Sequence, residues 1–279
     1  MKSHYIPKMY LKGWETIANG RNKQICVYEK NLLPTFKSRK EEVGYRENYY
    51  LDKTEKWLDK ELENKTSLIF EKLEKQLALD QEEKLKLAQF MFVIWQRVPF
   101  NIEGLFKDVN DLSLKHILAP FRKWQKVLGI KYNDFEKAYM TKERYKEVYS
   151  ELLMRETLEQ RSYITKMNWL FIKASQKNEF VISDNPFIFD RRIGIGNYLY
   201  GYILFPINRN TVLLCTHFKL PKNDYEECSK AINCDINRRI ISNSYSQVYA
   251  SFKSGKFSEF VNEFIGKDLS NKHSIITSH

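Results

Sequence analysis

The residues with the clearest potential for chemistry stand at the end of an apolar run late in the chain. The run Glu179-Phe180-Val181-Ile182-Ser183 predicts a β-strand, and Asp184-Asn185-Pro186 follows it directly. Proline has no N–H to donate to a sheet and holds the preceding residue in an extended conformation, so strand pairing should stop here. Because many enzymes keep reactive groups at strand ends, Asp184 is the first candidate catalytic residue, with Asn185 and Pro186 supporting it.

Two further candidates lie in the first fifty residues. His4 is surrounded in sequence by side chains that would hold its imidazole in place, namely Tyr5, Pro7, Tyr10, Leu11 and Trp14. Glu47 lies among Tyr45, Tyr49 and Tyr50, whose rings would remove water from its carboxylate and suit it to acid–base chemistry or metal binding. The structural alternatives are a hydrogen-bonding role for His4 near the first helix turn and a solvated strand position for Glu47.

Arginines supply the candidate phosphate-binding groups. Arg97 ends a strongly apolar predicted helix, where its guanidinium could bind a phosphate, pair with Glu47 or Asp184, or simply interact with the helix terminus. Glu63, next to a predicted buried leucine, is a candidate for the border of the same cleft. Arg191, Arg192 and Arg209 flank a strand whose three tyrosines, Tyr198, Tyr200 and Tyr202, could stack on single-stranded bases or pack in the core.

The candidate acids also suggest a metal site. Carboxylates are ligands that Mg²⁺ and Mn²⁺ prefer, so Glu47 and Asp184 are predicted to bind a divalent ion, with His4 as a further ligand or as general base. For Asp184 the structural alternative is an Asx turn before Pro186. The four cysteines show no CxxC pairing, which argues against structural zinc.

Composition limits the class of protein. The 279 residues, 43% hydrophobic, are enough for one or two cores, and the net charge of +11 favours a polyanionic partner, DNA or RNA. Residues 1–50 carry ten Lys and Arg against five Asp and Glu. The alternative is a general drift in composition, since the whole chain is rich in lysine. Neither a signal sequence nor a membrane span is evident, so we expect a cytoplasmic protein that makes no membrane contact.

Hydrophobic periodicity predicts the elements that position these residues. Residues 1–53 predict short strands and turns, residues 54–165 a helical block, and residues 166–279 a β-rich segment with C-terminal helices. Within these segments the pattern predicts helices near 111–128, 145–153, 222–243 and 257–265. We therefore predict a single α+β domain, in which a mixed or antiparallel sheet is built from the N- and C-terminal segments and the helical block packs beside it.

Five short motifs resemble a bacterial family, the domains of unknown function numbered 4238. They are HYIPxxYL from His4, ENYY from Glu47, WQRxP from Trp95, SDNP from Ser183 and FPIN from Phe205, and they extend over most of the chain. The family is similar to genes found near phage-defence and mobile-element loci. The resemblance implies emphasis on seven positions rather than a mechanism: His4, Pro7, Glu47, Arg97, Pro99, Asp184 and Pro186.

Two functions fit this set. The first is a metal-dependent phosphodiesterase or nuclease of a bacterial anti-phage defence or toxin-type system, in which His4, Glu47 and Asp184 act on a phosphate held by Arg97. The second is a non-catalytic module of a defence system that binds nucleic acid or a partner protein, with the same residues forming a hydrogen-bonded structural knot. Nothing in the sequence reveals the size of the pocket, so a hydrolase or transferase for small molecules is a third alternative.

Overall fold

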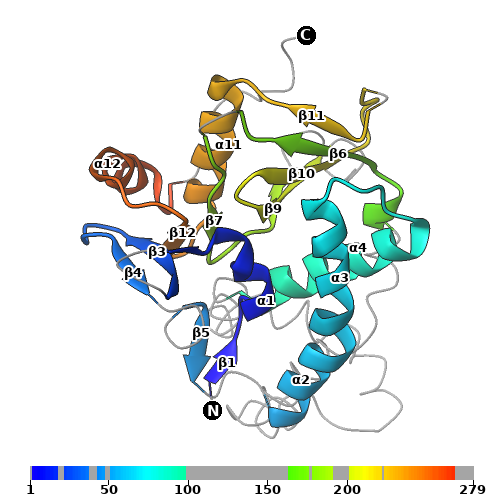
Figure 1. The fold of residues 1–279 in the computed structure, drawn as a ribbon, viewed down its shortest axis with the longest axis horizontal. Helices are drawn as coiled ribbons and strands as arrows, with labels where there is room; N and C mark the ends of the chain where they lie inside the picture. Colours follow the sequence, from blue (N-terminus) through cyan, green and yellow to red (C-terminus); the bar gives the residue numbers. More distant parts are fainter. Residues whose placement is uncertain are drawn as a thin grey trace, which may run out of the picture.

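Helices and mostly antiparallel sheets combine in the computed structural model, which confirms the predicted α+β class. The structure describes residues 2–17, 22–37, 43–47, 51–98, 163–175, 178–190, 201–221 and 223–267. The helices α2 to α4 lie on one side of the molecule and α11 and α12 on the other (Figure 1). No helix within these residues is both long enough and apolar enough for a membrane span.

One sheet comes entirely from the C-terminal half. Its strands, in spatial order, are β11 (Tyr225–Glu227), β6 (Asn168–Lys173), β10 (Thr211–Thr216), β9 (Tyr202–Asn208) and β8 (Ile188–Asp190). Neighbours are antiparallel except for β11 and β6. Every residue of β10 is buried, as expected for the central strand of a covered sheet.

A second sheet joins the two ends of the chain, as predicted. Here β3 (Lys23–Glu29) pairs with β2 (Thr16–Ile17), β4 (Thr35–Lys37) and β12 (Gln247–Ala250), and β12 pairs with β7 (Ile182–Ser183). A separate ribbon is formed by β1 (Lys2–His4) and β5 (Tyr45–Glu47), which lie side by side in Figure 1.

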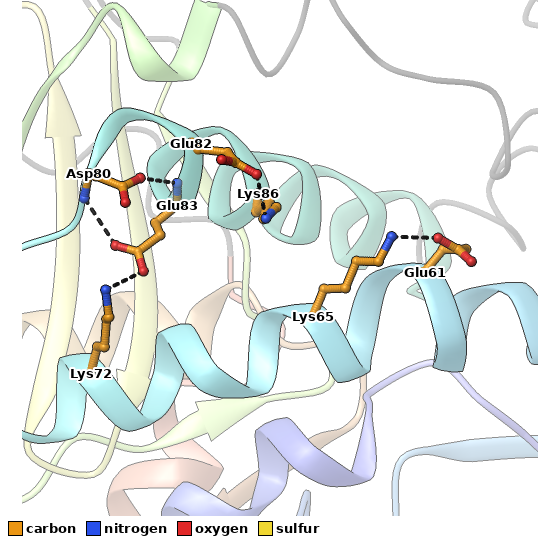
Figure 2. A network of polar contacts seen from close by, with 7 residues as sticks. All are labelled: Glu61, Lys65, Lys72, Asp80, Glu82, Glu83 and Lys86. Carbon is orange, nitrogen blue, oxygen red and sulfur yellow. Dashed lines mark hydrogen bonds and ion pairs between the residues drawn. The ribbon is translucent and has the colours of Figure 1, made fainter.

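The described part of the helical block consists of α2 (Asp52–Trp57), the π-helical segment η2 (Leu58–Glu63), α3 (Asn64–Glu74) and α4 (Gln81–Arg97). Asp80 begins α4 with a capping box, because its side chain accepts from the N–H of Glu83 while Glu83 accepts from the N–H of Asp80. Glu83 also pairs with Lys72 of α3 at 2.5 Å (Figure 2). These contacts fix the connection between α3 and α4.

The N-terminal segment that contains the HYIPxxYL motif packs against the C-terminal half of the chain. It contains α1 (Lys8–Leu11) and the 3-10 turn η1 (Lys12–Trp14). The ring of Tyr10 stacks on Phe205 of β9 with centroids 5.2 Å apart, and the indole N–H of Trp14 donates to the carbonyl of Phe180 at 2.8 Å. Gly13 is required here, because a Cβ at this position would lie 2.9 Å from Cβ of Asn208.

The structure corrects two predicted elements. Residues 222–243 were predicted to be helical, but β11 precedes α11 (Lys230–Ser242), since Tyr225 stacks on Phe171 and extends the sheet. In the predicted strand 179–183, only Ile182 and Ser183 pair with a strand. The helices predicted near 111–128 and 145–153 lie outside the described residues. The last helix, α12 (Gly255–Phe264), agrees with prediction.

Candidate functional site

His4 is held by the helical block through its own backbone. Its N–H donates to Oε1 of Glu55 at 3.2 Å, and its carbonyl accepts from Nη2 of Arg97. In β1 it is paired in register with Tyr45, and the two rings lie 5.9 Å apart. The residue is only 7% exposed, and contacts with Glu55, Arg97 and Tyr45 hold it in place.

Arg97 forms a buried ion pair, although not with either predicted partner. It is fully buried at the end of α4, and its Nη1 lies 2.8 Å from Oε1 of Glu63. Glu63 was predicted only to border the cleft, but it neutralises this guanidinium. A charge removed from water needs such compensation, so the observed role of Arg97 is to tie β1, η2 and α4 together.

The π-helical segment places Glu55 and Glu63 on the same side of their helix. In a regular α-helix of about 3.6 residues per turn, residues eight apart are offset by roughly 80° after two turns. The i→i+5 bonding of η2 widens its turns by about one residue, which removes most of this offset. Both carboxylates therefore approach Arg97, one through the ion pair and the other by proximity of charge.

His4 and Glu55 place an imidazole beside a carboxylate. Nδ1 of His4 lies 3.8 Å from Oε1 of Glu55, an ion-pair distance rather than a hydrogen bond. The far nitrogen, Nε2, and the second carboxylate oxygen, Oε2 of Glu55, are both buried, and neither has a hydrogen-bond partner among the described residues. Buried polar atoms without a hydrogen-bond partner are found where a ligand or a water binds or where the residue is catalytic.

The charge state of Glu55 follows from its neighbours. Burial raises the pKa of its carboxyl, but the contacts with His4 and the charge of Arg97 outweigh burial and hold the pKa below its ordinary value. Glu55 is therefore an anion at neutral pH. This anion can orient the imidazole of His4.

A pH-dependent contribution to stability is expected from Glu55. Because the folded state lowers its pKa, the contribution is present above the ordinary value of 4.5 and is lost as pH falls through the lower folded-state value. Urea unfolding of wild type and Glu55→Gln should show wild type losing its advantage as the pH falls below about 4.5. A difference between the two proteins that does not change with pH would contradict this.

The contacts of Asp184 are structural and differ from those of His4 and Glu55. It is fully buried, and its carboxylate accepts from the N–H groups of Tyr245, Ser246 and Gln247, at 2.7 to 2.9 Å, and from the Ser246 hydroxyl at 2.9 Å. Burial raises the pKa of Asp184, while these donors act to lower it. Asp184 thus anchors the turn that leads into β12.

The residues around Asp184 are engaged in the same way. Asn185 is nearly buried and exchanges side-chain to carbonyl hydrogen bonds with Asn243 at the end of α11, and Pro186 is buried beside it. Asn237 of α11 binds the N–H of Val181 and the carbonyl of Glu179, which replaces strand pairing there. The SDNP motif is therefore a structural junction between β7 and α11.

Glu47 and Asp184 occupy different environments. Glu47 is exposed at the end of β5, in register with Lys2, whereas both oxygens of Asp184 are already engaged. The described residues contain no group of three or more His, Cys, Asp or Glu side chains placed to hold a metal, and all four cysteines are free. Binding of an ion by Glu47 and Asp184 stays a prediction, and these contacts count against it.

The remaining predicted site residues are dispersed. Arg209 is 41% exposed and lies 3.9 Å from Glu179. Tyr5 is buried with its hydroxyl 3.5 Å from that of Tyr249, and Pro7 is buried at the start of α1. Arg191, Arg192 and Tyr49 lie outside the described residues, as do Pro99, Tyr198 and Tyr200.

Glu55 is the residue that prediction from sequence missed. A signal was present, because the buried stripe of this helix runs through Leu58, Leu62, Ile69 and Leu73, and Glu55 continues it by one turn toward the N-terminus. A carboxylate at an apolar stripe position is informative, since ionised groups are rarely buried without a partner. The partner, His4, is 51 residues away, and no local pattern identifies it.

Comparison with known proteins identifies a family. No curated protein and no solved structure matches the chain. One family model, described as protein of unknown function (DUF4238), matches residues 2–254, which include His4, Glu55, Arg97 and Asp184. The chain therefore belongs to the DUF4238 family.

Proposed function

We propose that this protein is an enzyme that acts on nucleic acid and cleaves phosphodiester bonds, with His4 as its general base. The observation that carries the proposal is the buried Nε2 of His4, which has no partner among the described residues and lies across the ring from the Glu55 carboxylate. A positioned imidazole of this kind accelerates reactions by removing a proton from an oxygen nucleophile.

The choice of substrate rests on charge. The net charge of +11 and the excess of Lys and Arg in the first fifty residues favour a polyanion. Several of these basic residues are exposed in the structure, among them Lys8, Lys12, Lys23 and Lys30. The proposal includes the cytoplasm as location and bacterial defence as setting, both of which rest on the sequence and on the family resemblance.

A cleavage assay tests this function. Purified protein should cleave RNA, single-stranded DNA or duplex DNA, and the assay is run with Mg²⁺, with Mn²⁺ and with a chelator. His4→Gln should cleave at least about 100-fold more slowly. If the wild-type protein leaves all three substrates intact in all three conditions, the proposed activity is refuted.

A non-catalytic binding module is the second candidate, and the contacts of Asp184 and Arg97 favour it. Two of the predicted functional side chains are buried and engaged in structural bonds, as expected of a structural knot. In this case nucleic acid should bind with an affinity that falls steeply with salt but should not be cleaved. His4→Gln should then bind as tightly as wild type.

A further inference from the structure

An aromatic cluster lies at one end of the C-terminal sheet. His217 and Phe218 directly follow β10, and Tyr163 belongs to the helical turn that precedes β6. Nε2 of His217 lies 3.1 Å from the hydroxyl of Tyr163, and the two rings meet edge to face with centroids 5.3 Å apart. Phe218 is 42% exposed, and the other two residues are half-buried. The cluster therefore presents aromatic surface to solvent.

Hydrogen bonds fix the backbone that carries these rings. The side-chain amide of Asn168 donates to the carbonyl of Phe218 at 2.8 Å, and the N–H of Phe218 donates to Oγ1 of Thr216 at 3.2 Å. The indole N–H of Trp169 donates to the carbonyl of Ile164 at 3.0 Å, which holds the turn before β6 in place. Because the backbone is already ordered, a ligand can contact the rings without the entropy cost of ordering a loop.

Positive charge accompanies the cluster. Exposed Lys166 lies in the turn before β6, and exposed Lys219 directly follows Phe218. The two segments that carry the cluster, residues 163–175 and 211–221, contain neither Asp nor Glu. Lysines next to exposed rings match the two parts of a nucleic-acid strand, since the ammonium groups bind phosphates and the rings stack on bases.

We infer that Tyr163, Lys166, His217, Phe218 and Lys219, which we call the Phe218 surface, bind a single strand of nucleic acid by base stacking. In a duplex the bases are already stacked on one another, so a single strand is the form that offers base faces to the rings. Every base has such a face, so single strands of DNA and of RNA should both bind. The inference rests on the proposed function for its class of ligand.

The Phe218 surface differs from the stacking strand that the sequence predicts. That strand contains Tyr202, which is buried and whose hydroxyl accepts from Nη1 of Arg239 at 2.7 Å. This ring is a core residue and is closed to a base. Among the described residues, the exposed aromatic surface with adjacent lysines lies instead beyond the end of β10.

The Phe218 surface is also separate from the candidate catalytic site. Nζ of Lys84, near the start of α4, lies 5.8 Å from the ring centroid of Trp169 in β6, whereas Arg97 ends α4 and donates to the carbonyl of His4. An α-helix rises about 1.5 Å per residue, so about 20 Å of α4 separates Lys84 from Arg97. Binding at this surface can therefore be measured independently of cleavage.

The first test measures binding by fluorescence anisotropy. The probes are a labelled single strand of about 16 nucleotides, as DNA and as RNA, and the matching duplex, and the protein carries His4→Gln so that the proposed cleavage does not consume them. Phe218→Ala should weaken binding of the single strands about 5- to 100-fold, the effect of one stacked base, and leave duplex binding unchanged. Tyr245→Ala, which removes a 38% exposed ring beside the Asp184 turn, should bind as tightly as the parent.

The role of the lysines is tested by salt dependence. In Lys166→Gln/Lys219→Gln the slope of the logarithm of affinity against the logarithm of salt concentration should become shallower by about 1.4, because each lost phosphate contact removes about 0.7 for a single strand. Lys253→Gln/Lys256→Gln removes the same charge from exposed positions near the start of α12 and should keep the parent slope. An unchanged slope in Lys166→Gln/Lys219→Gln would show that these lysines bind no phosphate and would overturn the inference.

Crosslinking locates the bound strand. A single strand that carries an iodinated uracil, irradiated in complex with the protein, should attach to Tyr163, His217 or Phe218, as identified by mass spectrometry of peptides. Equal affinity of Phe218→Ala and Tyr245→Ala, or crosslinks confined to other faces, would overturn the inference, and this result is expected if the surface binds a protein instead. It would leave the proposed function intact if the wild-type protein still cleaves. Single strands that bind as predicted but are not cleaved by wild type would refute the proposed cleavage alone, and absence of all binding would overturn both.

Discussion

Arg97→Met is expected to destabilise the protein by about 3–5 kcal/mol, because it leaves the Glu63 carboxylate partly buried without its partner. Arg97 is fully buried, and it also donates to the carbonyl of His4. Both the helical block and β1 should therefore lose an anchor. Urea unfolding at neutral pH measures the change in the free energy of unfolding.

Two further variants show whether loss of the ion pair between Arg97 and Glu63 causes this destabilisation. Arg97→Met/Glu63→Met should be less destabilised than Arg97→Met alone, since an apolar pair leaves no uncompensated charge. Arg209→Met removes a 41% exposed arginine that also lies near a glutamate, and it should change stability by less than about 1 kcal/mol. A double variant at least as unstable as Arg97→Met would show that Arg97 stabilises the fold by other means than its pair with Glu63.

Asp184→Ala is expected to cost about 3–5 kcal/mol, because it leaves three backbone N–H groups and one hydroxyl without their shared acceptor. Ser246 is exposed, so water can replace part of this loss. For a chain of this size the melting temperature should fall by roughly 6–15 °C.

The Asp184→Asn variant tests whether the carboxylate itself, rather than the shape of the side chain, provides this stability. An amide keeps the shape of the side chain but presents an NH₂ group to donors, so it should lose nearly as much stability as alanine. Asp59→Asn, at an exposed position of η2, is the matched control and should stay within about 0.5 kcal/mol of wild type. A stable Asp184→Asn variant would show that the carboxylate charge and its four donors contribute little.

The fold was largely predictable because it follows local patterns. The capping box at Asp80, the apolar stripe of α3 and the buried strand β10 all have strong signals in sequence. β11 was missed because its pairing with β6 is parallel and its contacts come from tertiary packing of Tyr225 on Phe171. The π-helical η2 has no sequence signature, yet it decides which carboxylates face Arg97.

The site was predictable only in part, because polar residues acquire partners through the fold. His4 was identified by its neighbours, whereas its connection to Glu55 depends on how β1 lies against α2. The sequence predicts Asp184 as a catalytic acid because it ends a strand before proline. Its hydrogen bonds could not be predicted, because the backbone of residues 245–247 folds back to donate to its carboxylate, and that contact depends on the sheet formed by β7 and β12.

The central claim is that His4 reacts while Asp184 supports the fold, and one measurement on two variants tests it most directly. We would compare the rate of nucleic-acid cleavage per folded molecule for His4→Gln and Asp184→Asn, at a temperature where unfolding curves show both to be native. We expect His4→Gln to lose at least about 100-fold with a small change in melting temperature, and Asp184→Asn to melt earlier but cleave at the wild-type rate. An active His4→Gln together with a folded but inactive Asp184→Asn would contradict the claim.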